Sequence, residues 1–433
     1  MMRIGRLALL MLTAAPLGAQ SVPSLMRQAD SAFAADDRAL ANRLYHQVVA
    51  FDAGQSRAIY RLGVLASNDA EALEWFKRYV TLEAADAWGW VAVGDKSLRL
   101  GLPVEARAAF QRAAALAPQA EDVRQRLAKG RLAAAPTVEP QGGYTRDSDG
   151  DHTTRAGVSA TIALHGGWRF GGHVTTSAIG DGLTTATLDE AALSLAGRPR
   201  PAWRFDFSGG PARLVQSDSG SWVTVLGDAR MRLRAHSTAL ELRLNRIALG
   251  TTPALVANHA VRNEAKLGFE LPAGPLRLRA DGRVALINVT GEDANRRVQA
   301  SAAVVLPVGW RGEFSVQYHE TGFQRPSTAG YFAPRRVETV EGGTYWDLGG
   351  DGAVSVSADL GAGAQRMALQ GAAVGPWKVA LRGWAALSID LTRTLQWRTE
   401  LEAYSAPFAP VGTSTAPDWR YGSLNTGLQV RLP

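Results

Sequence analysis

The sequence contains no cysteine among its 433 residues. This absence excludes disulfide bonds, thiol nucleophiles and thiolate metal ligands. After residue 20 the chain has no apolar run of about 18 residues, so no transmembrane helix is predicted. The catalytic motifs GxSxG and HExxH are missing as well, and the histidines are scattered along the chain. We therefore predict no catalytic residue, no cofactor and no resident metal.

One short segment contains the beginning of a metal-binding pattern. Residues Arg146–Asp151 read RDSDGD, which resembles the first half of a calcium loop. An EF-hand loop needs a glutamate at its twelfth position, and no acidic residue follows at that spacing. We interpret the segment as a solvated turn.

The first 19 residues have the composition of a secretory signal peptide. Arg3 and Arg6 precede the apolar run Leu7–Leu12, and small residues lead to an expected cleavage after Ala19. The alternative, a membrane anchor, is disfavoured because the run is too short to span a bilayer. A net charge of +7 would suit a nucleic-acid partner in the cytosol. An exported chain does not meet that partner, so no nucleic acid is predicted.

Residues 20–128 are rich in Ala, Leu, Arg and Glu at helical spacing. Within Ala87–Ala120, five residues fall at the spacing of a tetratricopeptide repeat: Trp90, Gly94, Ala106, Phe110 and Pro118. The small residues allow two helices to pack closely, the aromatic side chains fill the gap between them, and the proline ends the second helix.

Two weaker repeat units precede this one, which gives about three, the usual minimum for a stable solenoid. The region is predicted either to dock a protein partner on a concave surface or to act only as a helical spacer. Residues 129–140 are predicted as a linker.

From residue 141 to 433 the helical period disappears, and short segments of period two follow one another. In Asp228–Leu249, arginines alternate with apolar residues up to Ala235, and the pattern resumes after a turn at His236-Ser237-Thr238. About sixteen such segments are predicted as strands, with Trp222–Leu226, Ala353–Leu360 and Arg366–Val374 counted as separate ones.

A long series of strands with one apolar face needs something to cover that face. A two-sheet sandwich would have to pair these faces within one compact domain, and the segment is long for that. A closed barrel with lipid outside solves the problem. Nine of the twelve tryptophans lie in this region, mostly near predicted strand ends, which favours interfacial girdles over ordinary core positions.

The predicted fold is thus an α + β multidomain chain. An N-terminal tetratricopeptide-type α-solenoid is followed by an antiparallel transmembrane β-barrel of about 16 strands, residues 141–433.

The charged face of the predicted strands would then line the lumen. The pore-lining candidates are Arg230, Arg232, Arg234, Glu241, Arg243, Asn245, Arg277, Arg279, Asp281 and Arg283. After residue 140 only Lys266 and Lys378 are lysines, and arginine makes planar, bidentate contacts with carboxylates. These residues either form ladders that brace the wall or line a path for an anionic or hydroxyl-rich polymer.

One segment resembles a known family. Gly330, Tyr331, Phe332 and Pro334 precede a predicted strand. The segment is similar to the Tyr-Phe/Tyr-Ser-Pro motif in the C-terminal barrels of cellulose synthase operon protein C. Those proteins, like the poly-N-acetylglucosamine exporters, have a signal peptide, periplasmic tetratricopeptide repeats and a C-terminal barrel. This chain departs from them in its few repeats, in Ala333 where serine is usual, and in lacking a terminal aromatic residue. An ordinary aromatic turn before a strand is the alternative.

The resemblance implies a porin-like outer-membrane channel that exports a cellulose-like or poly-N-acetylglucosamine-like exopolysaccharide. Its expected partners are outer-membrane lipid, the polysaccharide, and a periplasmic or inner-membrane synthase component bound by the repeat domain in the periplasm. The alternatives are a scaffolding barrel with a plugged lumen and, least favoured, an outer-membrane enzyme.

Overall fold

The computed structural model describes residues 21–433 except residues 201, 218–219, 310, 350–351 and 406–418. The predicted signal peptide and Trp310 lie outside the described residues. The chain divides into two compact units: Met1–Leu100 with Ala108–Arg126, and Gly101–Arg107 with Leu127–Pro433. Among the described helices, none is long and apolar enough to cross a membrane.

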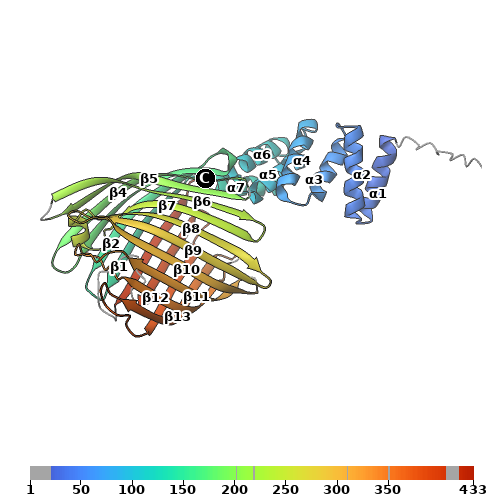
Figure 1. Cartoon of the computed structure of the whole chain (residues 1–433). Helices are drawn as coiled ribbons and strands as arrows, with labels where there is room; N and C mark the ends of the chain where they lie inside the picture. Colours follow the sequence, from blue (N-terminus) through green and yellow to red (C-terminus); the bar gives the residue numbers. More distant parts are fainter. Residues whose placement is uncertain (1–20, 201, 218–219, 310, 350–351, 406–418) are drawn as a thin grey trace, which may run out of the picture. The chain divides into compact units, whose positions relative to one another are not determined.

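Seven described helices precede the first strand (Figure 1). They are α1 (Val22–Ala34), α2 (Arg38–Phe51), α3 (Ser56–Leu65), α4 (Asp69–Leu82), α5 (Ala87–Arg99), α6 (Pro103–Leu116) and α7 (Glu121–Ala134). Asp37, Asn68 and Asp86 begin α2, α4 and α5 by accepting a backbone N–H at each helix start. Helices α1–α6 are three successive pairs, which confirms the predicted repeat fold.

Close packing between paired helices depends on small residues. A Cβ atom at Gly94 would lie 2.3 Å from the Phe110 ring, and one at Gly63 would lie 2.7 Å from the Phe76 ring. Ala106 and Phe110 are fully buried. Trp90 donates its indole N–H to the Ala84 carbonyl oxygen at 3.0 Å, and Pro118 follows the end of α6.

The predicted linker over 129–140 is wrong. Helix α7 continues to Ala134, and the first strand begins at Thr137. Residues Lys129–Ala134 contain good helix formers and extend the helix. Only Ala135 and Pro136 connect the two elements.

Sixteen antiparallel strands form one closed barrel, in which each strand pairs with its sequence neighbours and β1 pairs with β16 (Figure 1). The strands are β1 (Thr137–Asp147), β2 (His152–Ala163), β3 (Trp168–Gly180), β4 (Thr185–Arg200), β5 (Trp203–Gln216), β6 (Gly220–Ala235), β7 (Thr238–Ala248), β8 (Val261–Ala273), β9 (Leu276–Asn288), β10 (Asn295–Val308), β11 (Gly312–Phe323), β12 (Arg336–Asp347), β13 (Val354–Ala368), β14 (Lys378–Asp390), β15 (Leu395–Ser405) and β16 (Arg420–Arg431). A short helix, α8 (Pro253–Ala257), lies between β7 and β8. The predicted antiparallel barrel is confirmed.

Two strand predictions were too short. Trp222–Leu226 belongs to the same strand as the arginines that follow it, because β6 continues through Gly227-Asp228. In the same way β13 joins most of the predicted segment Ala353–Leu360 to the first three residues of Arg366–Val374. Gly227 of β6 and Gly361 and Gly363 of β13 lie inside continuous strands.

The face of the strands that carries Leu240, Leu242 and Leu244 is exposed. Large apolar side chains are exposed in the same alternation on the other strands, for example Leu267 on β8 and Val316 on β11. An apolar surface of this extent is stable only against lipid, so the barrel is a transmembrane one.

The two ends of the barrel differ. We call the end where β1 begins and β16 ends the termini end, and the opposite end the loop end. The connections at the termini end are mostly short turns, such as His236-Ser237, where His236 has φ 54°. The loop end carries the long connections 249–260 and 324–335.

The tryptophan prediction holds mainly at the termini end, although at the loop end Trp377 is exposed and packs against Arg366 of the outer face. Trp168, Trp203, Trp346 and Trp397 lie on the outer face near the termini end. There Trp203 and Trp168 stack with Phe205, at ring-centroid distances of 5.8 and 6.4 Å. By contrast, Trp222, Trp384 and Trp419 belong to the interior. The face that each tryptophan occupies is set by the alternation along its strand, and its distance from a turn does not predict that face.

The close approach at Gly94 generates a prediction about stability. Gly94→Ala should lower the free energy of unfolding of the helical region by about 1–3 kcal/mol, because the new methyl group overlaps the Phe110 ring. An ordinary helical Gly→Ala change stabilises by about 0.5–1 kcal/mol. Urea unfolding of the full chain in detergent, followed by the helical circular dichroism signal, measures the sign. The double variant with Phe110→Leu should recover part of the loss, and a stabilised Gly94→Ala variant would contradict the packing.

The facing of β6 and β7 generates a second prediction. Leu242→Arg should weaken folding in lipid by about 2–4 kcal/mol, because it places a charge at the lipid face. Arg232→Leu should cost much less, because Glu241 keeps its contact with Lys266 at 3.1 Å. The heat-modifiable gel shift of the folded barrel reports assembly. Equal losses for the two variants would overturn the facing.

Candidate functional site in the barrel interior

The inner face of the wall is identified by residues that meet across the ring. Arg155 of β2, Arg262 of β8 and Tyr404 of β15 line one cavity, although β8 is not a neighbour of β2 or β15. Such strands can meet only through the interior. The pairing places Arg262 on the same face as Arg243 and Glu241, opposite the exposed leucines.

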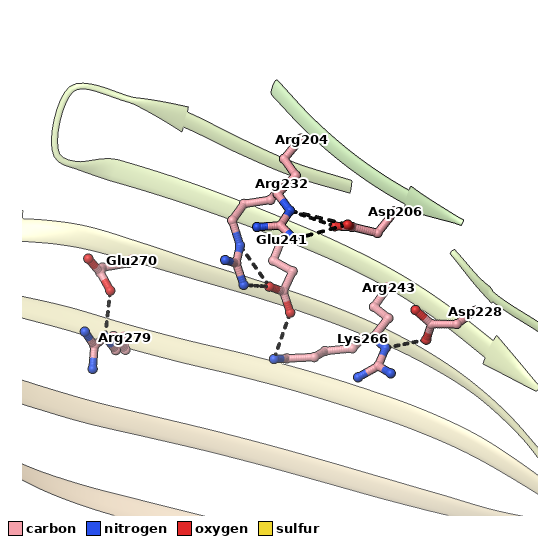
Figure 2. A network of polar contacts seen from close by, with 9 residues as sticks. All are labelled: Arg204, Asp206, Asp228, Arg232, Glu241, Arg243, Lys266, Glu270 and Arg279. Carbon is pink, nitrogen blue, oxygen red and sulfur yellow. Dashed lines mark hydrogen bonds and ion pairs between the residues drawn. The ribbon is translucent and has the colours of Figure 1, made fainter. Parts of the chain in front are cut away.

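All ten predicted pore-lining residues lie on this inner face by strand alternation. Five of them form ion pairs between strands: Arg232, Glu241, Arg243, Arg277 and Arg279. Figure 2 draws all of these except Arg277. Arg232 of β6 pairs with Glu241 of β7, which also accepts from Lys266 of β8 at 3.1 Å. Arg243 donates to Asp228 at 2.5 Å. The contacts cross strand boundaries, as the ladder hypothesis predicts.

A second cluster lies on β8, β9 and β11. Arg277 and Arg279 both contact Glu270 and Glu313, with Arg279 Nε at 2.6 Å from a Glu270 oxygen. Each carboxylate thus bridges two guanidinium groups. Next to them Arg283 donates to Asp281 at 3.0 Å. Exposed ion pairs contribute at most about 1 kcal/mol each, so the network orients the side chains more than it stabilises the wall.

Arg230, Arg234 and Asn245 are the predicted residues that the structure does not bring into these clusters. Among the described residues, Arg230 and Arg234 form no ion pair, and the Nε of Arg230 is buried without a hydrogen-bond partner. Arg234 is exposed near the turn at the termini end. These two arginines therefore keep charge that the wall does not neutralise.

Nearer the loop end Glu264 forms buried ion pairs with two arginines, Arg262 at 3.7 Å and Arg297. Arg297 of β10 donates to Glu264 of β8 at 2.6 Å, and each side chain is only 5% exposed. Removing one partner of such a pair typically costs about 3–5 kcal/mol, because the other charge stays buried. Sequence reasoning did not select either residue.

Three connections at the loop end pack together into what we call the loop cap, residues 249–260, 289–294 and 324–335. Leu255 and Tyr331 belong to one apolar cluster with Ile287 and Phe323, which lie on the inner face. Asn258 donates to the Ala329 carbonyl oxygen at 3.0 Å and joins two of the connections. The cap therefore folds toward the interior.

Helix α8 anchors the loop cap to the inner faces of β4, β5 and β6. Val256 packs with Leu188 of β4 and Leu214 of β5, whose side chains also face inward. The Trp222 indole N–H donates to the Val256 carbonyl oxygen at 3.1 Å. The inner face of β4 and β5 near the loop end therefore carries apolar residues, where the inner face of β6–β9 carries charged ones.

The family-motif residues form the centre of the cap. Tyr331 is buried, and its hydroxyl accepts from Asn295 Nδ2 at 3.0 Å; burial raises the pKa of this hydroxyl. Gly330 has φ 95° and lies against Ala254, so a side chain there would be strained. Phe332 is buried, and the Pro334 carbonyl oxygen accepts from Phe323 N. The segment is a buried loop core, more than an ordinary surface turn.

A cavity of about 380 Å³ lies in the interior near the loop end. Tyr404 of β15 stacks with Tyr421 of β16 at 5.7 Å, and Tyr421 stacks with Trp419 at 5.9 Å. Trp419 is buried and donates to Asp147 at 3.2 Å. Arg155, Arg262 and Glu402 also line this cavity. Flat aromatic faces beside charged hydrogen-bonding groups suit a ring-shaped, hydroxylated ligand.

Sequence reasoning missed this aromatic row. The alternation of Trp419 and Tyr421 was a visible signal, but Tyr404 joins them only through the pairing of β15 with β16. The turn predicted at Arg146–Asp151 lies beside the row. Asp147 accepts there from the backbone N–H groups of Asp149 and Asp151. Within the described ranges, no group of three His, Asp or Glu side chains could hold a metal ion.

No family model and no curated protein matches the sequence. The chain is similar in fold to a solved bacterial polysaccharide outer membrane secretin, with a TM-score of 0.50 and 12% identity over 69% of this chain and 99% of that chain. The helical region is similar to the MamA protein, with a TM-score of 0.25 and 23% identity over 25% of this chain and 62% of that chain. CdiB from Acinetobacter baumannii matches at a TM-score of 0.39 and 10% identity over 68% and 60% of the two chains. At these identities the similarity concerns the fold alone.

The loop cap generates a prediction about pH. Glu292 accepts from the Thr328 N–H and hydroxyl at 2.8 Å and from the Ser327 hydroxyl at 3.0 Å. Burial raises the pKa of Glu292, but these hydrogen bonds outweigh burial and hold the pKa below its usual range. The ionised carboxylate therefore stabilises the cap above the usual glutamate pKa, and this contribution is lost as pH falls through the lowered value.

Hydrogen exchange of residues 324–335 in the full chain should accelerate over that acidic window, after correction for intrinsic exchange. In Glu292→Gln the cap should open more readily at neutral pH and lose this part of the pH dependence. An unchanged acidic response in Glu292→Gln would contradict the role of this carboxylate.

Proposed function

We propose that this protein is an outer-membrane channel that exports a cellulose-like or poly-N-acetylglucosamine-like exopolysaccharide. The observation that carries the proposal is the stacked row Tyr404, Tyr421 and Trp419 beside a cavity inside a closed barrel. The similarity in fold to a bacterial polysaccharide outer membrane secretin and the motif at Tyr331 support it.

The barrel orientation follows from its two ends. Outer-membrane barrels keep short turns on the periplasmic side and long loops outside. The termini end, where β1 begins, would then face the periplasm. The loop cap would lie at the extracellular exit.

Passage would be passive and would need no catalytic group. The tyrosine faces stack on sugar rings, while arginines and carboxylates exchange hydrogen bonds with hydroxyl groups. Each contact is weak and is replaced by an equivalent one as the chain advances. A polymer can therefore slide along the wall without being trapped at one position.

The repeat region would dock a periplasmic or inner-membrane component of the polymer synthase. Helical repeats commonly present surfaces for protein partners. With three helix pairs the region is short, so the partner would need a periplasmic part that reaches toward the outer membrane.

A scaffolding barrel without transport is the second candidate, and the loop cap favours it. Leu255, Tyr331 and Phe323 pack into a cluster that covers part of the interior. Conductance of the purified barrel with residues 252–258 replaced by a Gly-Ser linker separates the two candidates. A barrel that stays closed without this segment would favour the scaffold.

The aromatic row generates the prediction that tests export. The double variant Tyr404→Ala with Tyr421→Ala should bind an oligosaccharide of the polymer roughly ten-fold more weakly, since about 1.4 kcal/mol of lost stacking is a factor of ten. Secreted polymer from cells should fall in parallel. Tyr144→Ala is the matched control, because Tyr144 is exposed on the outer face. Normal secretion by a well-assembled double variant would argue against export along this row.

A further inference from the structure

The inner face of β6–β10 carries an excess of positive charge. The seven predicted pore-lining arginines, together with Arg262, Lys266 and Arg297, make ten bases. Against them stand five acids: Asp228, Glu241, Glu264, Glu270 and Asp281. Each of these acids contacts at least one base of the same wall or its neighbour. The surplus therefore resides on guanidinium groups such as Arg230 and Arg234. We call β6–β10 the basic wall.

The inner face of β11–β16 and β1 carries the opposite excess. Nine acids lie there, of which Glu341, Asp359, Glu400 and Glu402 are away from the strand ends. The bases on this face are four: Lys378, Arg382, Arg398 and Arg431. Arg382 forms ion pairs with both Glu341 and Asp359, at 3.0 and 2.8 Å, and offsets one of these two charges. Glu400 and Glu402 form no ion pair with any described residue. We call this the acidic wall.

The two walls adjoin at β10 and β11, where Glu313 of the acidic wall pairs with Arg277 and Arg279. Elsewhere they face each other across the lumen. In the closed ring β8, at the centre of the basic wall, lies eight strands from β16 in the acidic wall. Their excesses are equal and opposite, since ten bases oppose five acids on one side and four bases oppose nine acids on the other. Charges on low-dielectric walls around a narrow aqueous space focus the field into that space. At physiological salt the field of exposed charges decays over about 8 Å, so each wall acts mainly on the groups that touch it.

We propose that the lumen is electrically polarised across its width, and that this polarity selects a polysaccharide whose sugars bear no net charge. The inference rests on the proposed export function. A chain that fills the lumen touches both walls at once. The hydroxyl groups of neutral sugars donate hydrogen bonds to carboxylates of the acidic wall and accept hydrogen bonds from arginines of the basic wall. Every contact is therefore favourable.

A charged polymer lacks this advantage. A polyuronate gains on the basic wall and is repelled by Glu400 and Glu402, and a polyamine meets the reverse arrangement at Arg230 and Arg234. The two excesses cancel, and the inner face of β2–β5 adds three bases, Arg155, Arg169 and Arg204, against two acids, Glu190 and Asp206. Neither sign of charge therefore gains much overall. Glu400, Glu402, Arg230 and Arg234 are therefore the specificity-determining residues.

The test measures binding of three oligosaccharides of equal length to the full chain in detergent at low salt, through the fluorescence of its tryptophans. The probes are a neutral cello-oligosaccharide, an oligogalacturonate and a chitosan oligomer. The wild-type protein should prefer the neutral probe. Glu400→Gln with Glu402→Gln should raise affinity for the oligogalacturonate several-fold, and Arg230→Gln with Arg234→Gln should raise affinity for the chitosan oligomer several-fold. Glu320→Gln, which removes an acid on the outer face, is the matched control and should change neither affinity.

Ion selectivity separates this proposal from the export function. In a planar bilayer under a salt gradient, the reversal potential of the barrel, with and without the 252–258 replacement, should be near zero. It should shift toward anions in the glutamate variant and toward cations in the arginine variant. Such shifts without any oligosaccharide binding would support the polarised lumen and count against export. Strong wild-type selectivity for one sign, or several-fold tighter binding of a charged probe than of the neutral one, would overturn the polarised lumen.

Discussion

Closure of the barrel by β1 and β16 is the constraint on which the rest of this structure depends. Lipid offers no hydrogen-bond partner, so each strand edge inside a bilayer must pair with another strand. Pairing between Thr137–Asp147 and Arg420–Arg431 removes the last two edges. Once the ring is closed, alternate residues of every strand face either the lipid or the interior. The Leu and Val positions meet lipid, and the Arg, Asp and Glu positions are gathered inside.

In a closed ring of this composition, most charged side chains face the interior, where they must pair with one another or with water. Bridging carboxylates such as Glu241 and Glu270 hold arginines from neighbouring strands in fixed orientations. Where the inner positions become apolar, at Leu214 and Ile287, loops fold in to cover them. The aromatic row at Tyr404 and Tyr421 lies on the acidic wall, beside the cavity near the loop end. The side chains that brace the wall are thus the same ones that face the lumen.

The fold was largely predictable because period-two alternation is a local signal. The hairpin around His236 and the helix pair at Gly94 and Phe110 each depend on residues close in sequence. The errors arose where local signals conflict. Trp222–Leu226 was predicted as a separate strand although β6 continues through Gly227, and residues 129–140 were predicted as a linker although Lys129–Ala134 extend α7. The aromatic row and the opposed walls were not predictable locally, because they depend on registers between distant strands and on closure of the whole ring.

Pairing between the first and the last strand also constrains the order of biosynthesis. The Leu432 amide donates to the Pro136 carbonyl oxygen, so the final residues of the chain complete hydrogen bonds begun almost three hundred residues earlier. Such long-range pairing is intrinsically slow to form. Until the C-terminus has been translated and exported, β1 has no permanent partner. A nascent chain would depend on chaperones to shield its apolar strands, and a product truncated before Arg420 would keep two open edges and invite degradation.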